Sequence, residues 1–193
     1  MKLLKYPVFL LTLIATITVV GCSSRAKLKY LNEPFTTTEL KIPLNVTGIE
    51  FNDNRTDTSS RALDIPRYTK NGQTDTVHQA LLPEHRAILT GEMESYFDGS
   101  GKEVEAVIEV LEGEKCFAAG RVAEVEYVKV KLGLTLLDTV HTPYFLKRNG
   151  EVAYEIKSLD AKNDFLEQLY QKALKAALYK CCEAISEALK QME

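Results

Sequence analysis

Hydrophobic and polar positions along the chain follow two different periods. Apolar residues recur every three or four positions from Pro83 to Phe97 and again over 163–192, which predicts two helices. Alternation with a period of two predicts β-strands at residues 42–51, 103–110, 121–138 and 152–156. This order, β-α-β-β-β-α, predicts an α+β two-layer sandwich. Its antiparallel sheet would have about four strands, with two helices on one face.

Three local features add detail to the predicted strands. Gly48 interrupts the first strand and predicts an irregularity there. Along 121–138 the charged residues change from even to odd positions, and this predicts a β-bulge near Tyr127 and Val128. The dipeptide Asn149-Gly150 is typical of a hairpin turn and is predicted to lead into the last strand.

The N-terminus has the pattern of an export signal. Lys2 and Lys5 precede an apolar stretch over 8–20 that is too short to span a bilayer, and Gly21-Cys22 ends it. This pattern resembles the lipobox of bacterial lipoproteins, which implies cleavage between Gly21 and Cys22 and acylation of Cys22. A plain secretory signal with an accidental cysteine and an uncleaved anchor helix are the alternatives.

The lipobox changes how the rest of the chain is divided. We predict a signal peptide over 1–21, a tether over 22–40 and one periplasmic domain over 41–193. Loss of the two signal lysines changes the formal net charge from −3 to −5, which argues against nucleic-acid binding. The resemblance implies an outer-membrane position facing the periplasm, because serines rather than acidic residues follow the lipidation site.

A long polar segment over 52–76 is the candidate partner loop, since long loops in compact domains are often functional. Asp53, Arg55 and Asp57 are its candidate contact residues. The segment does not match a calcium-binding loop of the EF-hand type. Counted from Asp53, Arg55 stands where such a loop needs an oxygen ligand, and Thr58 stands where it needs a glycine.

No residue of the chain is predicted to be catalytic or to bind a metal or cofactor. Gly99–Lys102 lacks the spacing and the following hydroxyl residue of a phosphate-binding loop. No two of the three histidines have a metal-ligand spacing on one helix. These histidines are His78, His85 and His141. Acidic residues along the second strand are predicted to be its solvated face, and these are Glu103, Glu105 and Glu109.

Three cysteines remain besides the lipidation site. Cys116 could form a disulfide with Cys181 or Cys182 in an oxidising periplasm. Cys181 also lies on the apolar stripe of the last helix, so it could equally be a small core residue.

The run Val46–Asp57, which ends in Asn-Arg-Thr-Asp, and the order of elements after it are similar to the YajG-like lipoproteins. The resemblance implies an envelope lipoprotein of unassigned biochemical role. We therefore predict a non-enzymatic lipoprotein that acts through protein or lipid contacts. The alternatives are an accessory lipoprotein of an envelope lipid or export transporter and, from a different class, a periplasmic hydrolase.

Overall fold

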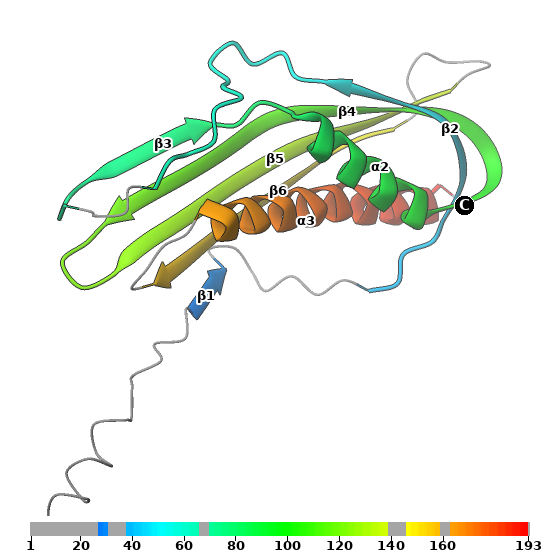
Figure 1. Ribbon diagram of the computed structural model, residues 1–193. Coiled ribbons are helices and arrows are strands. Elements are labelled where there is room, and N and C mark those ends of the chain that lie inside the picture. Colours follow the sequence, from blue (N-terminus) through cyan, green and yellow to red (C-terminus); the bar gives the residue numbers. More distant parts are fainter. Residues whose placement is uncertain (1–26, 31–37, 66–69, 139–145, 159–162, 193) are drawn as a thin grey trace, which may run out of the picture.

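The computed structural model describes residues 27–30, 38–65, 70–138, 146–158 and 163–192. Within them the strands are β1 (Lys27–Tyr30), β2 (Ile42–Asn52), β3 (Thr74–His78), β4 (Phe97–Ala119), β5 (Glu124–Asp138) and β6 (Leu146–Ser158). The helices are α2 (Pro83–Tyr96) and α3 (Asn163–Lys190). Figure 1 shows one layer of strands with both helices on the same face, which confirms the predicted α+β two-layer sandwich.

The sheet is larger than predicted and is mixed rather than wholly antiparallel. Its order is β1-β6-β5-β4-β2, and β3 also pairs with β4. The meander β4-β5-β6 is antiparallel as predicted, but β2 is parallel to β4. Two parallel neighbouring strands need a crossover connection that returns the chain to the end of the sheet where the first strand began. Helix α2, which comes between β2 and β4 in the chain, is part of this connection.

Strand β4 shares one side between two partners. Strand β2 pairs in parallel with the first part of β4, as far as Glu109, and β3 pairs antiparallel with residues 114–118. The C-terminal ends of β2 and β3 therefore approach each other near the middle of β4. A β-bulge at Leu111, between Val110 and Glu112, lies in the same part of β4.

The core lies between the helices and one face of the sheet. Alternate residues of β4 and β5 point into it and are buried, including Val104, Ile108, Val128 and Leu132. The opposite face is polar and carries ion pairs between strands, for example Lys129 with Glu112 and with Glu151. The predicted glutamate face of 103–109 belongs to this outer face.

The predicted bulge near Tyr127 and Val128 was wrong. Strand β5 alternates without interruption there, because Glu126 lies on the buried face with Val128 and not on the polar face. The extra residue belongs instead to β4, at Leu111. The other predicted irregularity, at Gly48 in β2, is confirmed by a register shift between Val46 and Gly48.

The predicted hairpin turn at Asn149-Gly150 was also wrong, because both residues lie inside β6 and pair with β5. A Cβ on Gly150 would overlap the backbone carbonyl oxygen of Ala177 in α3, so this glycine allows close approach of the helix to the sheet.

The segment 52–76 ends as strand rather than loop, since β3 begins at Thr74. Strand β1 lies within the segment predicted as a tether and pairs with β6.

Candidate functional site

A group of polar residues lies between the sheet and the first turns of the two helices. This buried polar cluster consists of Gln79, His85, Lys115 and Tyr170, which are buried, and of Glu167, whose side chain is 35% exposed. Lys115 comes from β4, His85 from α2, and Glu167 and Tyr170 from α3, while Gln79 directly follows β3. Ionisable residues are rarely buried without partners, so the contacts of each one matter.

Lys115 is the cation of the cluster and is almost fully buried. Its ammonium forms an ion pair with Glu167 and donates to Gln79 Oε1 at 2.9 Å. The same nitrogen lies 4.7 Å from the centre of the Tyr170 ring, which adds a cation–π contact. The ammonium is therefore held by one carboxylate, one amide and one aromatic ring.

His85 links the two helix starts and is completely buried. The backbone N–H of Leu82 donates to its Nδ1 at 3.3 Å, at the N-terminus of α2, where Pro83 occupies the first turn. On the other side of the ring, Nε2 lies 3.1 Å from Glu167 Oε1. Because Nδ1 accepts, the proton of the imidazole resides on Nε2 and is donated to the carboxylate.

Asp53 and Arg55 extend the polar contacts at the point where β2 and β3 converge. The guanidinium of Arg55 binds both carboxylate oxygens of Asp53, at 2.7 and 2.8 Å, and donates to the carbonyl of Gln79 at 2.8 Å. It also reaches the carbonyl of Gly113 at 3.4 Å, and Leu81 N–H donates to Asp53 at 3.1 Å. Burial acts to raise the pKa of Asp53, but Arg55 outweighs it and the pKa is lowered.

Gly113 leaves the space in which these side chains meet. A Cβ at this position would lie 2.5 Å from Tyr170 Oη, 2.9 Å from Arg55 Nη1 and 3.3 Å from the Gln79 carbonyl oxygen. The absence of a side chain on this residue of β4 therefore lets Arg55 approach the buried polar cluster.

Glu167 is the carboxylate of the cluster, and its surroundings strongly favour the ionised form. The hydrogen bond from His85 contributes most, burial opposes it, and the Lys115 ammonium adds to it, so the pKa falls from 4.5 to about 2. A carboxylate with this pKa is a weak general base near neutral pH, because an efficient base has a pKa close to the working pH.

This pKa predicts an acid-dependent loss of stability. Below pH 4.5 the unfolded chain binds a proton at Glu167 that the folded chain does not bind. The stabilisation is therefore complete above pH 4.5 and is lost as the pH falls towards 2. Urea unfolding at a series of pH values should show the free energy of unfolding falling between pH 4.5 and 2, and Glu167→Gln should make this fall smaller. An unchanged dependence of the free energy of unfolding on pH in that variant would contradict the lowered pKa of Glu167.

A separate cleft of about 480 Å³ lies between β2 and α2. It is lined by residues 45–49 of β2, by Thr90, Met93 and Glu94 of α2, and by Phe97 and Gly99. Glu94 is the titratable residue in this lining, and no member of the buried polar cluster contributes to it. The cleft and the cluster are thus two distinct features of the described residues.

The structure separates the candidate partner-loop residues. Asp53 and Arg55 are directed inward, with side chains that are each 13% exposed, whereas Asp57 is exposed and lies 3.8 Å from His78. His141, Gly21 and Cys22 lie outside the described residues. In the described parts of the chain, no group of three or more His, Cys, Asp or Glu residues is arranged to hold a metal ion.

Cys116, Cys181 and Cys182 are free thiols, and the structure does not bring Cys116 to the other two. Cys116 alternates with the buried Lys115 and Phe117 and so lies on the outer face of the sheet. Cys181 and Cys182 are buried on the helix side, near Leu132 and Met93 respectively. Burial raises the pKa of Cys181 to about 12 and that of Cys182 well above its usual value.

Sequence reasoning missed Lys115, Glu167 and Gln79. The available signal was the position of Lys115 in the alternation of β4. If Leu111 is counted as the extra residue of a bulge, Lys115 falls on the buried face of the strand. Glu167 offered no comparable signal, because a glutamate in the first turns of a helix is ordinary.

No protein-family model and no curated protein sequence matches the chain. Among solved structures, the fold is similar to the crystal structure of protein XCC0632 from Xanthomonas campestris, family model DUF330. The two chains share 13% identity with a TM-score of 0.49, over 79% of this chain and 88% of that one. A likeness at this level does not extend to function. None of the helices in the described residues is both long and apolar enough to cross a membrane.

Proposed function

We propose that this protein is a lipoprotein of the YajG-like type, anchored in the outer membrane through Cys22 and facing the periplasm. Its α+β domain acts by contacts with protein or lipid and carries out no catalytic reaction. The lipobox supports the anchor, and the fold offers a compact domain that begins shortly after it.

The observation that carries the contact-based role is the internal pairing of the buried polar cluster. Lys115, His85 and Glu167 have the side chains of an acid–base site, but the buried Lys115 and His85 both bind the carboxylate of Glu167. A hydrolase predicts a concave pocket that gathers titratable groups from separate elements. The cleft between β2 and α2 lies apart from this cluster, and this favours binding over hydrolysis.

A second candidate role is that of an accessory subunit of an envelope lipid or export transporter. Strand β2 favours a protein contact of this kind, because it forms one edge of the described sheet and also lines the cleft. The backbone groups of an edge strand can pair with an extended segment of another protein.

The anchor is tested by Cys22→Ser. We expect this change to abolish labelling of the protein with a fatty-acid analogue in cells and to leave the precursor uncleaved, because the acyl acceptor is lost. Cys116→Ser is the matched control and should be labelled like the unmodified chain. Labelling that persists in Cys22→Ser would contradict the lipoprotein assignment.

The role is tested by affinity purification of the tagged full chain from detergent-solubilised envelopes. Recovery of a transporter or an outer-membrane barrel in stoichiometric amount would favour the accessory role. Recovery of the protein alone, from membranes in which it is acylated, would disfavour it.

A further inference from the structure

The first described strand begins close to the predicted lipid anchor. Lys27, at the start of β1, is five positions after Cys22. A fully extended chain of five residues spans at most about 18 Å. If Cys22 is acylated, the beginning of β1 must therefore lie within this distance of the lipid attachment point.

The position of β1 determines which end of the domain is held near the membrane. Lys27 pairs with Lys157 at the end of β6, and Lys157 pairs with Val125 at the start of β5. The hairpin between β4 and β5 and the first residues of β3 lie at this same end of the sheet (Figure 1). We call this the anchor-proximal end, comprising residues 70–74, 119–125, 157 and 165.

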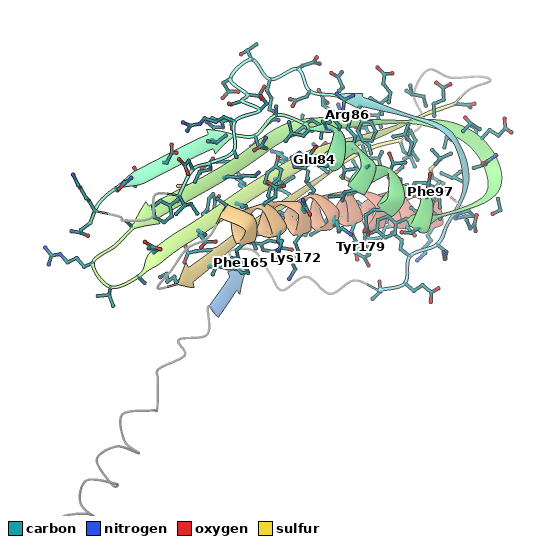
Figure 2. The ribbon with its side chains drawn as sticks, viewed as in Figure 1. Glu84, Arg86, Phe97, Phe165, Lys172 and Tyr179 are labelled. Atoms are coloured by element: carbon teal, nitrogen blue, oxygen red, sulfur yellow. The ribbon has the colours of Figure 1, made fainter. Side chains whose placement is uncertain are left out.

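Two of the exposed large hydrophobic side chains of the described residues, Val122 and Phe165, belong to the anchor-proximal end. The N–H of Gly120 donates to the carbonyl of Ala123 at 3.0 Å, which closes the hairpin and leaves Val122 at its tip, 83% exposed. Phe165 is 38% exposed in the first turn of α3, beside the end of β6 (Figure 2). Among the described residues, Met192 is the other exposed large hydrophobic residue, and it lies beyond the opposite end of α3.

Three exposed basic residues belong to the same end of the sheet. Arg121 at the hairpin tip, Lys70 before β3 and Lys157 at the end of β6 are all exposed. Acidic groups also lie at this end. Glu124 at the start of β5 is half-buried and has an interaction partner, Glu155 lies 3.7 Å from Lys157, and Asp75 lies 3.2 Å from Arg61. An apolar tip with flanking cations is the chemistry that suits the interface of a bilayer with anionic headgroups.

We propose that the anchor-proximal end is a second membrane contact, in which Val122 enters the interface of the bilayer that holds the lipid anchor. Arg121 and Lys70 then lie among the headgroups, and Phe165 lies against the lipid surface. The inference rests on the proposed acylation of Cys22, because the short connection is what brings this end to the bilayer. Its consequence is a fixed orientation, with the cleft side of β2 and the end of α3 directed away from the membrane.

The test uses the full acylated chain in vesicles of phosphatidylethanolamine and phosphatidylglycerol. In a Cys116→Ser background, Val122→Cys and, as matched control, Met192→Cys each carry an environment-sensitive fluorophore; Cys181 and Cys182 are buried. The control site is an exposed apolar residue separated from the hairpin by α3, whose 28 residues span about 42 Å. Bromination of the lipid acyl chains should cause a loss of fluorescence at position 122 and none at 192.

Further variants test the role of charge. Arg121→Glu combined with Lys70→Glu should reduce the quenching at position 122, since each basic group near an anionic surface strengthens binding about fivefold. Absence of quenching at 122, or equal quenching at both positions, in protein that is acylated would overturn the membrane contact and leave the anchor standing. Failure of acylation, measured by labelling of the same samples, would remove both proposals.

Discussion

Gly150→Ala is expected to lower the free energy of unfolding by about 3 kcal/mol or more, the upper part of the range for overpacked cores. The added methyl group would overlap the backbone carbonyl oxygen of Ala177 and lie 3.0 Å from Lys180 Cβ. The backbone of α3 cannot relieve this overlap by changing rotamer as a side chain could, so part of the helix must move away from the sheet. Urea denaturation followed by circular dichroism would measure the change.

Gly91→Ala is the matched control for this substitution. Gly91 lies in α2, and a Cβ there meets no atom within 4 Å. The change should stabilise the protein by about 1 kcal/mol, because alanine is the better helix former. The two Gly→Ala substitutions should thus have opposite signs. A neutral Gly150→Ala would mean that α3 does not pack as closely on β6 as described.

Glu167→Ala is expected to destabilise the domain by about 3 kcal/mol, the lower end of the range for breaking a buried pair, because this side chain is one-third exposed. The loss leaves the ammonium of Lys115 in the core without its carboxylate. Adding Lys115→Met should restore much of the stability, since the stranded charge is then removed. Chemical denaturation of the two single variants and the double variant forms a double-mutant cycle that isolates this coupling.

Glu92 supplies the control for Glu167. It also lies on a helix and pairs with a lysine of the other helix, at 2.7 Å from Lys175, but this lysine is half-exposed. Glu92→Ala should therefore destabilise the protein by about 1 kcal/mol or less. Equal effects of the two Glu→Ala changes would show that burial of the polar cluster does not govern its contribution.

Periodicity predicted the elements whose local pattern and tertiary role agree. The alternation at Val104–Ile108 and the apolar stripes of the two helices identified the layers correctly. The turn predicted at Asn149-Gly150 was wrong because the preference of this dipeptide for turns is local, while its place in β6 is decided by contact with α3. The bulge predicted near Tyr127 and Val128 was wrong because Glu126 is buried, and a buried glutamate shifts the apparent polar face by one residue.

The candidate site could not be assembled from the sequence. Its main members, His85, Lys115 and Glu167, are far apart in the chain and belong to three different elements. Asp53 and Arg55 were noticed for their polarity, but their inward orientation depends on carbonyl groups of Gln79 and Gly113 that only the folded sheet places beside them. Such sites depend on topology, which periodicity does not specify.

The meeting of β2 and β3 on one side of β4 has a consequence for how the sheet edge is completed. The two strands run towards each other, so neither can continue past the point of meeting, and the carbonyls of Gln79 and Gly113 lie there. Gln79 N–H donates to Gly113 at 2.8 Å, and Arg55 donates to both carbonyls. The guanidinium of Arg55 thus supplies hydrogen-bond donors at the point where strand backbone ends. One side of β4 is in this way covered by a parallel strand and an antiparallel strand in succession.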